Sequence, residues 1–235
     1  KLKAGLDENG IENLEKRYNA GGRGVAFMLK YIRALKGCGD VAKAREVALE
    51  LLTSLNDEER MSAPCWGIYD DVELSPEGSG NMIYLLKHVD QFRQSVGAEQ
   101  VDNRIALLFE GQLEDVLRGK NKNVILADVE NLETMLKSYH LTGKDYLFDY
   151  ISLIKFIQTG DSENALAACR KVFTPMSDEK LSFLYFQPIL ALKGKWTKSQ
   201  KKELKILTME LVERVENAVL KDSLKSFADT MISNL

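Results

Sequence analysis

The chain partly repeats itself at an offset of 121 residues, without a gap. The matched positions are turn residues and apolar residues. They pair Tyr18 with Tyr139, Gly22 with Gly143, Arg23 with Lys144, Phe27 with Phe148, Ile32 with Leu153, Leu35 with Phe156, Gly39 with Gly160, Asp40 with Asp161, Ala44 with Ala165, Leu51 with Val172, Leu55 with Met176, Asp57 with Asp178 and Glu58 with Glu179. One supersecondary unit used twice is typical of stacked-helix proteins, in which each unit buries its apolar face against a neighbour.

The spacing of apolar residues within the first copy is helical. Between Val25 and Leu35 they recur three or four residues apart, which predicts one amphipathic helix. The glycines on either side of Cys38 end this helix, and Asp40 is placed to cap the next one, which extends to Leu55. The second copy has the same order: a helix over 146–157, a Gly160–Asp161 turn, a partner helix over 165–173 and a further start at Ser177.

The remaining segments extend the helical pattern. Helices are expected over 82–96, 98–117 and 124–139, and along a stripe of apolar residues between Thr197 and Asn234. No stretch alternates apolar and polar residues as a strand would, so we expect no sheet. Residues 74–81 are rich in Gly, Ser and Pro and predict a surface loop, and Pro188 should kink or end the helix begun near Ser177.

These elements predict an all-α chain of about ten to twelve helices in stacked antiparallel pairs. We expect one helical-repeat domain over residues 1–235. Its parts are repeat unit one at about 11–72, the loop at 74–81, middle helices at 82–131, repeat unit two at about 132–192 and C-terminal helices at 196–235.

Composition excludes some classes of function. The net charge of −3 gives no global reason to expect nucleic acid or an anionic membrane as a partner. No apolar run approaches the ~20 residues of a transmembrane helix. The chain begins at Lys1 with neither Met nor a signal peptide, so we expect a processed product with further sequence upstream.

No catalytic, cofactor-binding or metal-binding residue is predicted. His88 and His140 each lack a second ligand at helical spacing. Cys169 lies in an apolar run typical of a buried thiol, and Cys38 lies in a turn where it could be exposed. Paired carboxylates such as Asp57–Glu58 fall at helix starts, where capping explains them.

The sequence leaves two alternative sites open. Cys38 or Cys65 could serve a thiol-active redox enzyme. The segment Lys193–Lys205 carries six lysines and Trp196, a combination that can hold single-stranded nucleic acid. Aromatic residues could also anchor a protein partner, although each fits a core position as well. The aromatic candidates are Trp66, Tyr69, Tyr84, Tyr185 and Trp196.

One further set of residues carries a resemblance to a known family. Its members are Gly5-Leu6-Asp7-Glu8-Asn9, Leu14, Tyr18, Gly22-Arg23, Phe27, Tyr31 and Leu35, then Leu55-Asn56-Asp57-Glu58-Glu59 with Trp66, and Gly143-Lys144-Asp145 in the second copy. These residues resemble the region that follows the thioredoxin-like domain in certain bacterial envelope proteins. The likeness covers essentially the whole chain, although Gly24 replaces the acidic residue expected after Arg23. The resemblance implies a tetratricopeptide-like right-handed superhelix and a location in the cell envelope or periplasm, with the full-length protein either secreted or lipid-anchored.

The function expected from these observations is non-catalytic. The chain should be a protein-interaction or scaffolding module without a cofactor, accessory to a thioredoxin-like thiol-disulfide domain that this chain lacks. It should bind a protein or peptide partner, on the inner helices of the two repeated pairs. No catalytic residue carries over from the resemblance, because the Cys-x-x-Cys pair of such proteins is absent here.

Overall fold

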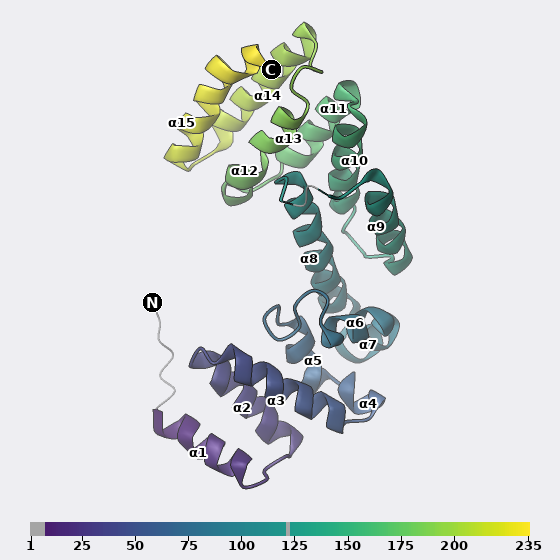
Figure 1. The fold of residues 1–235 in the computed structure, drawn as a ribbon, viewed down its shortest axis with the longest axis vertical. Helices are drawn as coiled ribbons and strands as arrows, with labels where there is room; N and C mark the ends of the chain where they lie inside the picture. Colours follow the sequence, from purple (N-terminus) through teal and green to yellow (C-terminus); the bar gives the residue numbers. More distant parts are fainter. Residues whose placement is uncertain (1–7, 121–122) are drawn as a thin grey trace. The chain divides into compact units, whose positions relative to one another are not determined.

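The computed structural model describes residues 8–120 and 123–235, and no strand occurs in these two ranges. The chain divides into two units, Lys1–Ile105 and Ala106–Leu235. Each unit contains one copy of the sequence repeat, folded as a pair of helices packed against each other (Figure 1). The expected all-α chain of packed helix pairs is therefore confirmed, whereas the single domain over residues 1–235 and the superhelical path stay predictions.

The first unit contains α1 to α7 and the beginning of α8. Their bounds are α1 Glu8–Asn19, α2 Val25–Gly37, α3 Val41–Ser54, α4 Asp57–Arg60, α5 Ala63–Asp70, α6 Gly80–Lys87, α7 Val89–Val96 and α8 Ala98–Leu117. The pair α2 and α3 buries Tyr31, Ile32, Val47 and Leu51 almost completely.

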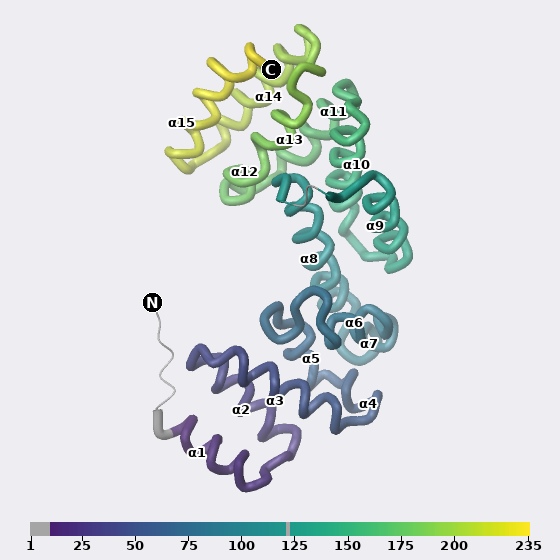
Figure 2. The backbone as a smooth tube through the Cα atoms, viewed as in Figure 1, coloured from purple at the N-terminus to yellow at the C-terminus, as the bar shows by residue number. Residues whose placement is uncertain are grey.

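The second unit contains the end of α8 and all the later helices. Their bounds are α9 Leu126–Tyr139, α10 Tyr146–Thr159, α11 Ser162–Phe173, α12 Asp178–Leu184, α13 Phe186–Ala191, α14 Lys198–Arg214 and α15 Ala218–Ser226, followed by a π turn at Phe227–Met231 and a 3₁₀ turn at Ile232–Asn234. The backbone trace shows α10 and α11 side by side, as α2 and α3 are in the first unit (Figure 2).

The two helix pairs share the same turn chemistry. Gly39 (φ 87°) and Gly160 (φ 72°) both have left-handed backbones, which glycine adopts without steric cost. The amide of the next residue reaches back to the carbonyl of Leu35 in one copy and of Phe156 in the other, at 2.9 Å each. Asp40 and its equivalent Asp161 then each accept a backbone N–H of the following helix. The repeat therefore fixes a Schellman-type helix end followed by an N-cap.

The helix expected over 82–96 is two helices. His88 (φ −123°, ψ 31°) separates α6 from α7, and its N–H donates to the carbonyl of Leu85 instead of to residue 84. The break turns α7 so that Phe92 is fully buried, with its ring centroid 4.7 Å from that of Tyr69. Because the apolar residues keep helical spacing across the break, the sequence pattern did not reveal it.

The segment 74–81 is only partly a surface loop. Leu74 and Ser75 are buried, and α6 already begins at Gly80. The Ser75 hydroxyl donates to the Ile68 carbonyl at 2.7 Å, and the Arg104 guanidinium donates to the Ser75 carbonyl at 2.7 Å. Partners for these polar groups allow the loop to enter the core, because a buried polar group must be hydrogen-bonded to be tolerated.

The break expected at Pro188 is confirmed. The helix begun after Ser177 ends at Leu184, four residues before Pro188. In a continuous helix the Pro188 ring would clash with the Leu184 carbonyl. The apolar stripe of the last segment is divided between two helices. Helix α14 ends at Arg214, just before Val215, and Ala218 begins the separate helix α15. Along the described ranges, no helix combines the length and the apolar character that crossing a bilayer requires.

Candidate functional site

A pocket of about 420 Å³ lies in the second unit. Its wall is formed by α8, α10, α11, the start of α12 and the turn between α11 and α12. Its lining residues are Glu110, Tyr146, Asp149, Tyr150, Lys171, Val172, Pro175, Met176, Ser177 and Lys180. This set, called the unit-2 pocket below, combines an apolar interior with charged side chains.

Two tyrosines on α10 form the aromatic wall of the unit-2 pocket. Tyr146 and Tyr150 are four residues apart and therefore on the same helix face, with ring centroids 6.0 Å apart in an edge-on arrangement. Burial raises the pKa of Tyr150 to about 12, so its hydroxyl stays protonated at physiological pH. Tyr146 is 37% exposed, so this ring can contact a ligand.

Lys180 is held by two carboxylates of α8. Its Nζ lies 2.5 Å from Glu110 Oε1 and 2.9 Å from Glu114 Oε1. Burial disfavours the ammonium form, but the hydrogen bonds and charges of the two glutamates outweigh burial and raise the pKa of Lys180. Lys180 is consequently a charged link between α12 and α8, and it is too basic to act as a proton acceptor at neutral pH.

A second pair, Asp149 and Lys171, contributes to the charged part of the lining. Their charged atoms are 3.9 Å apart, and the lysine side chain is 70% exposed. An exposed ion pair of this kind contributes little to stability, because water screens it and both side chains lose rotamer freedom. Both groups can therefore turn toward a ligand at low cost.

The unit-2 pocket combines apolar side chains with a few polar ones. Its lining includes neither histidine nor cysteine, and its serine hydroxyl, Ser177, accepts the backbone N–H of Lys180 as a helix cap. Among the described residues, no three His, Cys, Asp or Glu side chains lie close enough together to hold a metal ion. An apolar interior with a few polar groups is the usual composition of a ligand pocket.

Four of the five aromatic anchor candidates are core residues. Tyr69 and Tyr185 are fully buried, and Trp66 and Trp196 are 8% and 5% exposed. Tyr84 is half-buried and donates its hydroxyl to Asp57 at 2.7 Å. None of the five lines the unit-2 pocket.

The three cysteines differ in access. Cys38 is exposed in the turn after α2, whereas Cys65 and Cys169 are buried. Burial raises the pKa of both buried thiols, to about 12 for Cys169. A buried thiol with a raised pKa is a poor nucleophile, so Cys38 is the thiol that a redox mechanism would have to use.

The basic segment Lys193–Lys205 lacks the stacking platform that its sequence suggested. The Trp196 ring is buried, and its Nε1 donates to the carbonyl of Ile189 at 2.9 Å. A base cannot stack on a buried indole, and stacking supplies much of the affinity for single strands. The lysines of α14 belong to an exposed face instead.

The two histidines have structural positions. His88 separates α6 from α7, with its ring centroid 4.4 Å from that of Tyr84. His140 ends α9 with a left-handed backbone (φ 48°). Each lies at a helix end, where it interrupts the backbone pattern.

The unit-2 pocket was missed by reasoning from single motifs, although the repeat contains a signal for it. At the offset of 121 residues, Val25 and Leu29 are replaced by Tyr146 and Tyr150, and Glu50 by Lys171. The positions that match between the copies are turn and core positions. Positions where the second copy gains tyrosine or changes charge are therefore where a new site should be sought.

Comparison with protein-family models, curated proteins and solved structures finds no match for this chain. The resemblance to the helical region of thioredoxin-family envelope proteins therefore stays an expectation. Its first residues, Gly5, Leu6 and Asp7, lie outside the described residues.

Proposed function

We propose that this protein is a non-catalytic helical-repeat module that binds a protein or peptide partner through the unit-2 pocket. The observation that carries the proposal is the combination of the Tyr146–Tyr150 wall with a lysine, Lys180, that is fully engaged by two glutamates. Such a lining offers apolar contact and orientation without a reactive group.

The ligand chemistry follows from the lining. Tyr146, which is 37% exposed, offers apolar contact area beside the largely buried Val172 and Met176, so the occupant should insert an aromatic or long aliphatic side chain. Asp149 and Lys171 carry opposite charges, so a neighbouring charge of either sign on the partner finds a counterpart. A partner segment with one apolar anchor flanked by polar residues fits both features.

Selection from a displayed random-peptide library tests this proposal. Peptides enriched on the wild-type protein should carry an aromatic or Met anchor and should lose binding to Tyr146→Ala. The matched control is Phe183→Ala, since Phe183 is also an exposed aromatic of the second unit (55% exposed) but does not line the pocket. Enrichment without an apolar anchor, or equal loss in both variants, would refute the proposal.

The cell-envelope location and the accessory role beside a thioredoxin-like domain rest on the sequence resemblance alone. Intact mass and N-terminal sequencing of the natural product from its source cells test them. A heavier product with an upstream Cys-x-x-Cys domain supports this part of the proposal. A product that begins near Lys1 removes it and leaves the binding role of the unit-2 pocket unchanged.

The rival function, a redox enzyme, is tested through thiol reactivity. In the folded protein we expect only Cys38 to react promptly with a disulfide reagent, at the rate of an ordinary exposed thiol. A Cys38 that reacts far faster, with a depressed pKa, would favour the enzyme over the binding module.

A further inference from the structure

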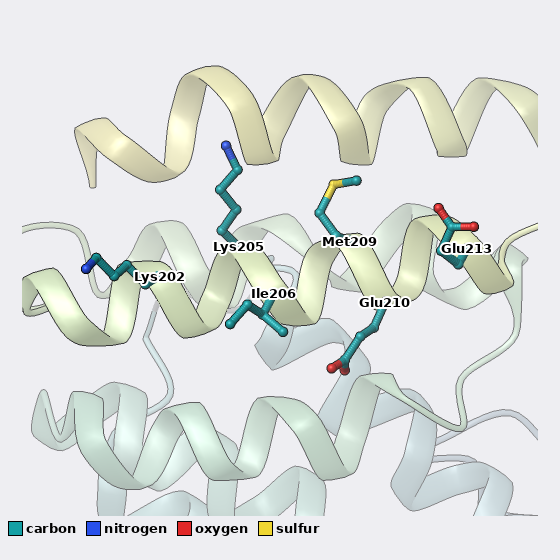
Figure 3. Close-up of a pocket in the computed structure, with 6 residues that line it drawn as sticks. All are labelled: Lys202, Lys205, Ile206, Met209, Glu210 and Glu213. Atoms are coloured by element: carbon teal, nitrogen blue, oxygen red, sulfur yellow. The ribbon is translucent and has the colours of Figure 1, made fainter.

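One face of α14 exposes charged and apolar residues in a regular order. An open groove of about 580 Å³ along this helix is lined by Lys202, Lys205, Ile206, Met209, Glu210 and Glu213. Figure 3 shows Lys205 and Met209 directed toward one side of α14, with Ile206 and Glu210 directed toward the other. This set is called the α14 face below.

The centre of the α14 face is apolar and its ends are oppositely charged. Ile206 is 54% exposed, and Met209 is half-buried beside it. Lys205 and Glu210 each have a partner within the unit, Asp229 at 3.2 Å and Arg170 at 2.5 Å. For the outermost charges, Lys202 and Glu213, no ion pair is found within the part of the chain that the structure describes.

The charge order of this face opposes the preference of an isolated helix. On this face Lys202 lies in the second turn of α14, toward the helix end where the dipole favours acids, and Glu213 lies in the last turn, where it favours bases. The stability of α14 alone therefore does not explain the pattern. Residues that break a local rule point to a role outside the local structure.

The α14 face is complementary to itself. Lys202 and Glu213 lie at equal distances from the midpoint between Leu207 and Thr208, and the same holds for Lys205 with Glu210 and for Ile206 with Met209. Two antiparallel copies of α14 related by a two-fold axis through this midpoint bring Lys202 of one copy opposite Glu213 of the other. The axis repeats each contact, as an isologous interface requires.

We propose that the α14 face docks against the α14 face of a second copy of this chain. The central contact is Ile206 against Met209, and the lysine and glutamate ends pair around it. A neighbouring depression, lined in part by Leu166 and Ala167 of α11 and by Gln200 of α14, continues the contact surface on the α11 side.

The dimer should be weak. Helix α14 has 17 residues, which at 1.5 Å per residue gives a seam of about 25 Å. A single helix face supplies less than the roughly 800 Å² per partner of a standard stable interface. The neighbouring α11 surface must add area, and the association should show a clear concentration dependence.

Sedimentation velocity over a concentration series, with charge-reversal variants of the full chain, tests the dimer. Lys202→Glu and Glu213→Lys should each raise the dimer dissociation constant by about tenfold, because each turns two attractive pairs into two repulsive ones. An equimolar mixture of the two variants should restore dimerisation, since every facing pair is then of opposite charge. Lys87→Glu on α6 and Glu130→Lys on α9 are matched controls at exposed positions of other helices and should leave the constant unchanged.

The mixing result separates the proposal from simple damage to the fold. Both substitutions bring α14 closer to the charge order that a helix prefers, so neither should unfold it. A wild-type chain that stays monomeric at its highest soluble concentration overturns the proposal. A dimer that persists in both single variants, or one that mixing fails to restore, overturns it as well. Ile206→Asp at the centre should abolish the dimer entirely.

Discussion

Replacing Arg104 by methionine should strongly destabilise the first unit. Arg104 is only 3% exposed. Its guanidinium donates to the Tyr69 carbonyl at 2.9 Å and to the Ser75 carbonyl at 2.7 Å. The first of these carbonyls lies near the end of α5 and the second in the segment before α6, so one side chain fixes two parts of the chain.

The expected magnitude follows from those two carbonyls. Arg104→Met leaves both buried and unpaired, at about 1–3 kcal/mol each. Burial lowers the pKa of Arg104 because a buried charge is costly, and removing this charge returns part of the loss. We therefore expect the free energy of unfolding to fall by about 3 kcal/mol, within a range of 2 to 5.

Each unit contains one buried tryptophan, Trp66 in the first and Trp196 in the second, so fluorescence can report on each unit separately. In a Trp196→Phe background, urea unfolding followed by Trp66 reports on the first unit alone. With an m-value of about 1.5 kcal/mol/M, the loss should lower the midpoint by roughly 2 M.

Arg33→Met is the matched control for this experiment, since Arg33 is exposed on α2. Its effect should stay within about 0.5 kcal/mol, as for most surface substitutions. Equal midpoints for Arg104→Met and Arg33→Met would refute the reasoning, because the two buried carbonyls would then have no need of the guanidinium.

Two further predictions concern the second unit and use Trp196 as the reporter. Hydrogen bonds from Lys137 and Lys155 lower the pKa of Glu133. These hydrogen bonds add about 1 kcal/mol to the stability of the folded protein. The contribution is present above the pKa that Glu133 has in the unfolded chain, and it is lost as the pH falls through the lower pKa of Glu133 in the folded protein. Glu133→Gln should therefore destabilise at neutral pH but not in acid, and a pH-independent difference would contradict this. Gly160→Ala should lower the free energy of unfolding by about 1 kcal/mol, because Gly160 has a left-handed backbone (φ 72°). Gly111→Ala within α8 should raise it by roughly 0.5–1 kcal/mol, because alanine favours a helix and has room there. Effects of equal sign in the two variants would count against the left-handed turn.

The parts of the fold that sequence predicts are those fixed by local chemistry. Gly39 with Asp40, and Gly160 with Asp161, end one helix and cap the next through contacts within a few residues. The capping box of Asn56 and Glu59 is local in the same way. Because such signals do not depend on the rest of the structure, they can be read directly from spacing.

The features that sequence misses depend on partners far along the chain. Ser75 looks like a loop residue until Arg104 is known to bond its carbonyl from 29 residues away. The kink at His88 leaves the apolar spacing unchanged, so only packing of Phe92 against Tyr69 reveals it. Aromatic content did not distinguish a core residue such as Tyr185 from a pocket residue such as Tyr146, since burial decides between them.

The two copies of the repeat show that surface positions can change while the scaffold of the helix pair stays the same. In the first copy Glu50 of α3 accepts hydrogen bonds from Tyr18 of α1 and from Arg23. In the second copy the equivalent position is Lys171, which pairs only loosely with Asp149 and lines the unit-2 pocket. The turn residues are the same in both copies while the surface residues differ. The turns determine how the two helices of a pair are joined, and the surface residues do not. Function in this chain should therefore be sought where the copies differ, and the unit-2 pocket is such a place.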